Sequence, residues 1–531
     1  MPTPPRILLF ASLAAVLLPA SARPQEPKPG QRWYEDSTEL GFRFKSPEGW
    51  NFIPPQPGDL GLVGKYASPS GQLMVDPKSS QAWDYGLWIV AFDRRPAKEG
   101  EQERPRGAST LQEWVEGAMS GVSVRLSDQK PGRIGKTETI EYNFEGTLGE
   151  LEVGVFATLY HLRPDVDVAL VFNGLGGRNW SKFERAFKKI CATFAPLEVK
   201  SVAAATGPLS LRDRKRAELS AEVANQPGWQ VYETENYFLI SSNKDREFLE
   251  ELMGRLEAIR KVYEETYPPA LALELRRAAE AARKAAEASG EKEGPPGSDP
   301  GKPQEGAQES APQEGQTVAE RADPMELSRT SLVRVCKDQD EYMQYGGPGG
   351  SAGYWSPGQQ ELVIYDDKAV GGRGDTWATL NHEAFHQYIF YFFGSLTPHY
   401  WYNEGTGDFY SGYEYKNKRF TLKPFDWRQR TIQGMAREGT HVPLKEFVRF
   451  DRAKYYGEQI SENYAQGWAL VYFLRTGRKG ASCWNKAWDK ILDTYLRVLV
   501  ETDDLDKAVD AAFAGVDWDE FEKCWKQYTL Q

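Results

Sequence analysis

Histidine and cysteine are both rare in this sequence, which has five His and four Cys among 531 residues. Four cysteines are too few for a scaffold held together by disulfides, and no C-x-x-C pair occurs, which argues against a zinc site built from thiolates. The cysteines are Cys191, Cys336, Cys483 and Cys524. They allow three complete pairings. Cys483 with Cys524 is the pair to test first because both lie in a predicted helical region, and buried unpaired thiols are the alternative.

The sequence also lacks an excess of positive charge. Lys and Arg number 65 against 76 Asp and Glu, a net charge of −11, so the chain lacks the surplus of cations that a general nucleic-acid binder needs. The 25 Phe, 26 Tyr and 16 Trp can fill a substantial core, which excludes a wholly disordered chain. At roughly 100–200 residues per domain, the length predicts two to four domains.

Only one long apolar run occurs, Ile7–Leu18 near the amino end. Its twelve residues fall short of the ~20 that span a bilayer, and Ala20-Ser21-Ala22 after it fits a small-x-small cleavage pattern. Residues 1–22 are therefore predicted to be a secretory signal peptide, with a membrane anchor as the alternative. We expect an exported protein, periplasmic or extracellular, with no integral membrane segment after cleavage.

Residues 33–197 form the first predicted domain, in which apolar and polar residues alternate. Strands are expected at 86–92, 137–144, 151–162 and 166–172, and amphipathic helices at 110–119 and 180–194. The pattern predicts an antiparallel sheet with helices packed on it, an α/β sandwich. With the opening Gly41–Trp50, it resembles the photosystem II subunit P and Mog1-like sandwich domains. His161, alone in a strand pattern, is interpreted as structural, and the domain as a non-catalytic accessory one.

Residues 198–228 are predicted to be a linker or helical connector, and a second domain follows at 229–531. Its front holds expected strands at 229–231, 237–241 and 332–335, and two more strands around a Ser-Pro-Gly turn within 353–365. Helices are expected at 245–267 and 271–289, and the chain from 376 onwards is expected to be mostly helical. An insert at 290–322, rich in Gly, Pro, Glu, Gln and Ser, is expected to be disordered. The fold class is therefore α+β.

The second domain contains His382-Glu383-Ala384-Phe385-His386 within a predicted helix. On a helix, His382 and His386 are one turn apart and point to the same side, so two imidazoles can bind one Zn²⁺. Glu383 can then approach a water on that ion without being a ligand, and can take its proton as a general base. The alternative is a pair of surface histidines on an ordinary helix.

A catalytic zinc ion needs a third protein ligand, and the sequence offers one after the helix. Eighteen residues beyond His386 lies Glu404, in the segment Asn403-Glu404-Gly405-Thr406-Gly407-Asp408. Thr397-Pro398 can turn the chain, so a second helix starting near Trp401 can present Glu404 to the metal. Asp408 lies four residues further on the same face, where it can accept the free N–H of a ligating histidine.

These residues resemble the gluzincin metallopeptidases. The H-E-x-x-H helix followed by N-E-G-x-x-D carries the likeness, and the surrounding features resemble the peptidase MA-like domain: Tyr354-Trp355, Leu362–Tyr365 and Asn463–Trp468. The resemblance implies zinc as cofactor, with His382, His386 and Glu404 as ligands, Glu383 as general base and Asp408 bonded to His382. The Gly-x-Met-Glu-Asn motif of the aminopeptidases is absent, so exopeptidase specificity is not implied.

A zinc peptidase also needs a donor for the oxyanion that develops at the scissile carbonyl. Tyr464 is the first candidate, with His399, His441 and Tyr402 as rivals. Leu362–Tyr365 is a candidate sheet edge, along which an extended peptide would pair by main-chain hydrogen bonds.

The expected function is an exported zinc peptidase that acts on a peptide or protein substrate. Two alternatives stay open: a zinc hydrolase of another substrate class, and a binding protein with a structural or degenerate zinc site.

Overall fold

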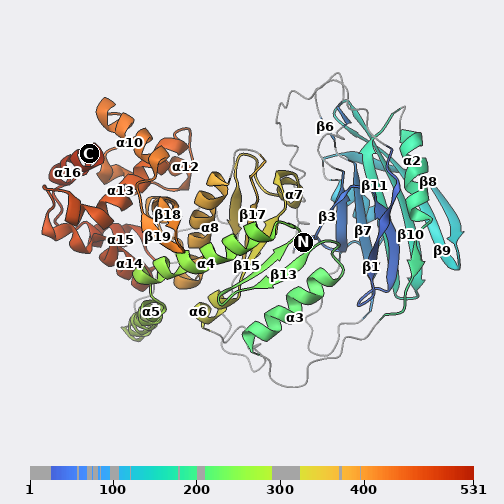
Figure 1. The fold of residues 1–531 in the computed structure, drawn as a ribbon, viewed down its shortest axis with the longest axis horizontal. Helices are drawn as coiled ribbons and strands as arrows, with labels where there is room; N and C mark the ends of the chain where they lie inside the picture. The colour runs from blue at the N-terminus through green and yellow to red at the C-terminus, as the bar shows by residue number, and fades with distance from the viewer. Residues whose placement is uncertain are drawn as a thin grey trace. The chain divides into compact units, whose positions relative to one another are not determined.

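The computed structural model describes residues 26–56, 59–68, 74–75, 82–83, 85–95, 107–119, 121–177, 180–199, 210–289, 323–369, 373–394 and 396–531. The predicted signal peptide at 1–22 and the insert at 290–322 lie outside these residues. The chain folds into two compact units (Figure 1). Unit 1 holds the described residues up to Val231 with Ile240–Ser242 and Cys336–Gly350, and unit 2 holds the remainder. The protein is α+β, as predicted.

Unit 1 is built on an antiparallel seven-stranded sheet. In spatial order its strands are β3 (Asn51–Ile53), β4 (Leu62–Ala67), β7 (Gly86–Asp93), β11 (Val166–Leu175), β10 (Leu151–Arg163), β9 (Thr137–Leu148) and β8 (Ser123–Ile134). A smaller sheet joins β1 (Pro29–Asp36), β2 (Phe42–Pro47) and β12 (Ala195–Pro196). This arrangement is the predicted sandwich-like domain with an antiparallel sheet.

Two helices pack on the seven-stranded sheet, one on each face. Both faces offer apolar side chains, because successive residues of a strand point to opposite sides. Helix α1 (Leu111–Ala118) packs Trp114 and Val115 into a core with alternate residues of β10 and β11, and a capping box between Thr110 and Glu113 starts it. Helix α2 (Trp180–Cys191) stacks Phe187 on Phe172, which alternates with the residues of β11 that face α1. Figure 1 shows α2 beside this sheet. Helix α3 (Leu211–Ala224) lies within the predicted linker.

Most residues of a five-stranded sheet belong to unit 2. Its strands follow the order β13 (Gln230–Glu233), β14 (Tyr237–Ser241), β15 (Ser331–Cys336), β17 (Glu361–Tyr365) and β16 (Gly353–Ser356). The prediction that Leu362–Tyr365 forms the sheet edge is wrong. Strand β17 lies between β15 and β16 with every residue buried, as its uninterrupted apolar run requires. The antiparallel turn places β16 outside β17, so β16 is the edge strand.

Helices make up most of the remainder of unit 2 and enclose a large aromatic core. The main ones are α4 (Arg246–Thr266), α5 (Pro269–Ser289), α8 (Gly374–Phe393), α9 (Tyr400–Ser411), α10 (Asp426–Glu438), α13 (Ile460–Gly480), α14 (Ile491–Thr502), α15 (Leu505–Ala512) and α16 (Trp518–Thr529). A hairpin of β18 (Tyr413–Lys416) and β19 (Arg419–Leu422) interrupts them and was not predicted. Within the described residues, no helix is both long enough and apolar enough to cross a membrane.

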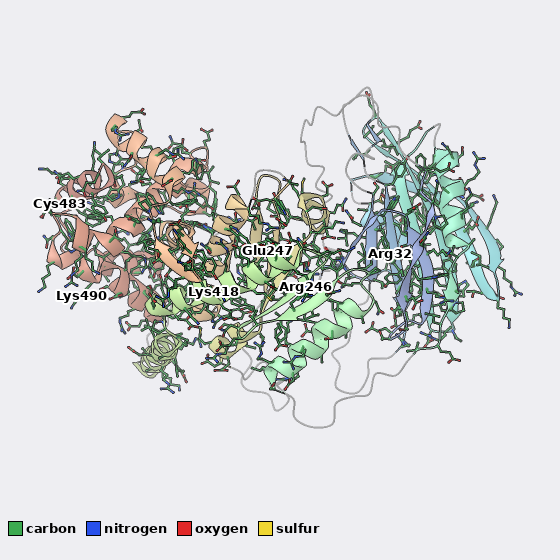
Figure 2. The ribbon with its side chains drawn as sticks, in the orientation of Figure 1. Arg32, Arg246, Glu247, Lys418, Cys483 and Lys490 are labelled. Carbon is green, nitrogen blue, oxygen red and sulfur yellow. A yellow bond between two sulfur atoms is a disulfide. The ribbon has the colours of Figure 1, made fainter. Side chains whose placement is uncertain are left out.

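One disulfide joins the loop after α13 to helix α16. It links Cys483 and Cys524, which confirms the pairing singled out from the sequence. Cys483 is labelled in Figure 2, at the outer side of the C-terminal helices. Cys191 and Cys336 are buried elsewhere and take no part in it.

Candidate metal centre

Helix α8 carries the two histidines on the side that faces away from its core contacts. Leu380, Ala384 and Phe385 are fully buried on the core side of the helix, which packs against β16 and β17. His382 and His386 are one turn apart, and their Nε2 atoms lie 2.9 Å from each other. The sequence prediction of a shared imidazole face is therefore confirmed.

Helix α9 brings the third candidate ligand to the same point. The Oε2 atom of Glu404 lies 3.2 Å from His382 Nε2 and 3.4 Å from His386 Nε2. Within the described part of the chain, these three residues are the group of His, Cys, Asp and Glu side chains placed to hold a metal ion. Their convergence matches the arrangement expected from the 18-residue spacing.

The donor set and its spacing fit a zinc ion. Two imidazoles and one carboxylate are a known ligand set of catalytic zinc. Four tetrahedral ligands at about 2.0–2.1 Å from zinc lie about 3.3 Å from each other. The two distances from Glu404, 3.2 and 3.4 Å, match this separation. The 2.9 Å distance between the two Nε2 atoms would have to increase slightly on metal binding.

Asp408 stands behind the first histidine. Its Oδ1 lies 3.1 Å from His382 Nδ1, and its Oδ2 accepts a 2.6 Å hydrogen bond from Arg428 Nε. Asp408 and Arg428 are both buried. Because Asp408 occupies Nδ1, the Nε2 atom of His382 is the one left to face the other two candidate ligands, as a metal ligand requires.

The buried charges shift one another's pKa values. Burial disfavours the imidazolium of His382, but hydrogen bonds to Asp408 and Glu404 outweigh it and raise the pKa of His382 well above its usual value. Burial likewise disfavours the carboxylate of Glu404, yet the charge of His386 and hydrogen bonds to both histidines hold the pKa of Glu404 well below its usual value. Glu404 is therefore ionised, the state in which a carboxylate binds metal.

Glu383 is held beside the cluster by the edge strand. The backbone N–H of Trp355 on β16 donates a 2.9 Å hydrogen bond to Glu383 Oε2. Burial is the largest influence on this carboxyl and raises the pKa of Glu383, while the two histidines oppose the rise. A carboxylate so placed, adjacent to the candidate ligands without being one of them, can accept or donate a proton there.

Two tyrosines line the cluster on the side of helix α13. The ring of Tyr464 lies 6.4 Å from the ring of His382 and 6.2 Å from that of Tyr456. Tyr456 follows the short helix α12 (Arg452–Tyr455), and its hydroxyl donates a 2.8 Å hydrogen bond to Glu404 Oε1. Burial raises the pKa of both phenols, so both are neutral donors.

The three rivals to Tyr464 have partners of their own. His399 Nδ1 lies 2.9 Å from the hydroxyl of Tyr495. His441 Nε2 lies 3.1 Å from Glu522, and the Tyr402 hydroxyl lies 3.0 Å from that of Tyr267. Of the four candidates, Tyr464 is the one whose ring lies close to a candidate ligand.

Glycine at positions 405 and 407 is required by close approach. A Cβ atom at Gly407 would lie 2.7 Å from the ring of His382, which Asp408 holds in place. A Cβ atom at Gly405 would lie 2.5 Å from the backbone oxygen of Gly467 on α13. The glycines next to Glu404 thus let α9 lie directly against the histidine ring on one side and against α13 on the other.

Sequence reasoning missed three groups at this site. Arg428 and Tyr456 are 20 and 52 residues from their partners Asp408 and Glu404, and no local pattern marked either one. The third group is the backbone N–H of Trp355, which any residue type would supply. The sequence contained only an indirect indication of this group. A strand at the edge of a sheet has backbone N–H groups that no neighbouring strand uses, and these can donate to a side chain of the H-E-x-x-H helix.

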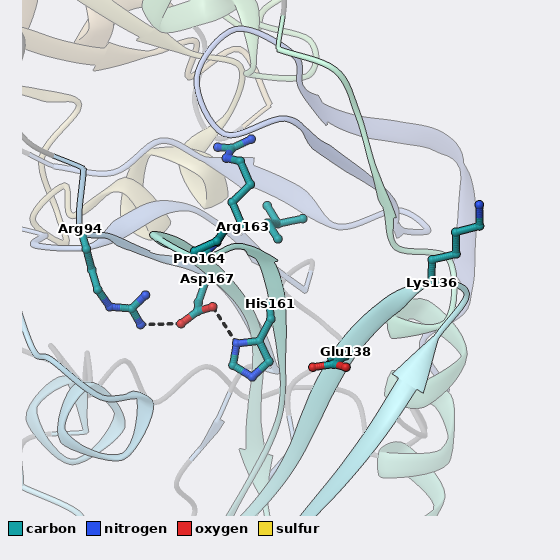
Figure 3. Close-up of a pocket in the computed structure, with 8 residues that line it drawn as sticks. Arg94, Lys136, Glu138, His161, Arg163, Pro164 and Asp167 are labelled. Carbon is teal, nitrogen blue, oxygen red and sulfur yellow. Dashed lines mark hydrogen bonds and ion pairs between the residues drawn. The ribbon is translucent and has the colours of Figure 1, made fainter.

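Unit 1 has a pocket of about 660 Å³ at one end of its sheet (Figure 3). There the carboxylate of Asp167 contacts Arg94 at 2.5 Å and His161 Nδ1 at 2.8 Å. The polar partner of His161 agrees with its interpretation as a structural residue. Figure 3 shows these three side chains pointing toward one another, so Asp167 has both Arg94 and His161 as partners within the pocket.

Comparisons with known proteins give little for this chain. No family model and no curated protein matches it. Among solved structures, the cyanobacterial PsbP protein of Synechocystis matches with 11% identity and a TM-score of 0.23, covering 31% of this chain and 91% of that one. The Ran-binding protein Mog1p of Saccharomyces cerevisiae matches with 12% identity and a TM-score of 0.20, covering 30% of this chain and 91% of that one. Both likenesses are weak, and neither bears on what this protein does.

Proposed function

We propose that this protein is an exported, zinc-dependent peptidase. The observation that carries the proposal is the convergence of His382, His386 and Glu404 from two helices onto one point. The position of Glu383 beside that point, and of Asp408 behind His382, supports a catalytic role over a purely structural one. A structural zinc site is closed by four protein ligands, whereas this cluster offers three and leaves a position open for water or substrate.

In this proposal, the metal is bound by His382, His386 and Glu404, and Glu383 is the general base. A bound zinc ion supplies Lewis-acid activation of water and of the scissile carbonyl. Glu383 removes the proton from the attacking water at Oε1, because Trp355 holds its Oε2, and later returns that proton to the departing amine. Tyr464 donates to the oxyanion that develops at the carbonyl oxygen.

Strand β16 favours a peptide as the substrate. It is the edge of its sheet, and Trp355 on it is bonded to the proposed base, so a peptide that pairs with this strand would lie next to Glu383. An extended peptide is recognised along a sheet edge by main-chain hydrogen bonds. This favours peptides over other hydrolysable substrates.

Export is supported by two observations. The apolar run Ile7–Leu18 is followed by Ala20-Ser21-Ala22, as in a secretory signal peptide. The disulfide between Cys483 and Cys524 suits an oxidising compartment outside the cytosol. Amino-terminal sequencing of the exported fraction tests this part of the proposal, and a chain that begins at Arg23 is expected.

Metal analysis combined with a cleavage assay tests the enzymatic part. The purified full chain is expected to contain one zinc ion and to cleave peptides from a pooled library, with activity lost on chelation and restored by zinc. His386→Ala is expected to lose the metal. His161→Ala, which changes a histidine in unit 1, is the matched control and should keep it. Zinc without cleavage of any peptide would favour another hydrolase or a binding protein.

A further inference from the structure

The carboxylate of Glu404 has a different partner on each of its oxygens. Oε2 faces the Nε2 atoms of His382 and His386, at 3.2 and 3.4 Å. Oε1 accepts a 2.8 Å hydrogen bond from the hydroxyl of Tyr456. Because an ionised carboxylate only accepts hydrogen bonds, Tyr456 is the donor. The phenol therefore selects which oxygen remains available to a metal ion.

Tyr456 is itself held in place by other aromatic rings. Its ring packs edge-on against Tyr400 at 5.0 Å and against Tyr464 at 6.2 Å. These ring contacts hold the hydroxyl of Tyr456 against the ligand carboxylate.

We propose that Tyr456 is a positioning residue that makes Glu404 bind the metal through Oε2 alone. Without this donor, the carboxylate could turn about its terminal bond or bring both oxygens to the ion. One-oxygen binding leaves a coordination position open, which a catalytic zinc requires. This inference rests on the proposed function, because it concerns the same metal ion.

A role in general stability is the competing explanation for Tyr456, and its exposure argues against it. Its side chain is 36% exposed, whereas the neighbouring Tyr455 is fully buried. Removing one hydroxyl from a partly exposed ring creates no cavity in the core. Tyr456→Phe is therefore expected to fold normally, and its loss of stability when metal-free should be no larger than that of one hydrogen bond.

Zinc affinity is the decisive measurement. In competition with a zinc-binding dye, Tyr456→Phe is expected to bind zinc about 10- to 100-fold more weakly, the usual loss when a residue that orients a ligand is removed. In the cobalt(II)-substituted protein, the same change should weaken the visible absorption as the coordination number rises. Tyr472→Phe is the matched control, because it removes the phenol hydroxyl of a partly buried tyrosine on α13. It should change neither the zinc affinity nor the cobalt spectrum.

The possible failures of this inference and of the proposed function are distinguishable. If the unchanged protein binds no zinc, the proposed metal site itself is wrong and this inference is wrong with it. If the unchanged protein binds zinc, and Tyr456→Phe binds it within twofold of the same affinity with the same cobalt spectrum, the positioning role is overturned while the metal site stands.

Discussion

The backbone N–H of Trp355 and the carboxylate of Glu383 are joined by a 2.9 Å hydrogen bond, although 28 residues separate them. Through this bond a sheet edge orients the acid that follows the first histidine of the H-E-x-x-H sequence. Because the donor belongs to the backbone, substitutions of the Trp355 side chain leave the bond in place. The position of strand β16 therefore contributes directly to the geometry around the candidate metal site.

The first prediction concerns the general base. Glu383→Gln should retain zinc and lose peptide hydrolysis, by about 10²- to 10⁴-fold, because an amide cannot take the proton from water. Metal analysis and the peptide-library assay on the same sample measure both effects. Glu247→Gln, an exposed substitution on α4, should behave like the unchanged protein. Hydrolysis by Glu383→Gln at the unchanged rate would show that another group is the base.

The second prediction concerns the carboxylate behind His382. Asp408→Asn should weaken zinc binding about 10- to 100-fold, because a neutral amide no longer fixes the ring and leaves Arg428 buried without its counter-ion. Dye competition measures the change. Asp426→Asn, an exposed substitution on the same helix as Arg428, is the control. Equal zinc affinity in the two variants would rule out a role for Asp408 in holding the histidine.

The third prediction concerns stability in acid. Burial lowers the pKa of His399 to about 4. The hydroxyl of Tyr495 accepts from the backbone N–H of His399 and lies 2.9 Å from its Nδ1, which suits a neutral ring. An unfolded histidine, with a pKa of about 6.5, binds a proton more readily. The contribution of His399 to stability is therefore complete above about pH 6.5 and is lost as the pH falls towards 4.

This contribution is on the order of 3 kcal/mol. His399→Asn keeps a polar group for Tyr495 but does not titrate in this range. Denaturant unfolding at several pH values should therefore show a shallower loss of stability between pH 6.5 and pH 4 in the variant. Parallel curves for the two proteins would mean that His399 takes up a proton as readily in the folded state as in the unfolded chain.

The fourth prediction concerns the disulfide. Cys483 and Cys524 close a loop of 41 residues, and the cross-link restricts the unfolded chain. Its removal should cost about 4 kcal/mol of stability on the loop-entropy estimate. Denaturant midpoints of the protein with the bond intact and of the Cys483→Ser/Cys524→Ser variant measure the effect. A common midpoint would show that the C-terminal helices hold together without the bond.

Much of the fold was predictable because its strands and helices have clear periodicity. Helices α8 and α9 lie where the apolar spacing and the Thr397-Pro398 turn placed them. Strand β8 was missed because it is an edge strand with mostly exposed residues and contains Pro131 and Gly132, so it lacks the alternation of a buried strand. The β18–β19 hairpin is also short and polar on alternate residues within a helical region.

The candidate ligands were predictable for a different reason than their supporting residues. His382 and His386 are fixed relative to each other by helix geometry alone, and Glu404 follows after one turn of the chain. Tyr456 and Arg428 meet the site only after the C-terminal helices have packed, so their role depends on contacts between distant segments. The order of β16 and β17 in the sheet was predicted wrongly. The sequence of one strand shows its periodicity, but it does not show which strands pair with it.

The contact between Gly405 and Gly467 has a mechanical consequence. With no side chain between them, α9 and α13 touch backbone to backbone, and no rotamer change can absorb a shift of one helix against the other. A tilt of α13 is therefore expected to move the helix that bears Glu404. The C-terminal helices thus support the corner at which Glu404 meets the two histidines, and a change in their packing is expected to disturb that geometry.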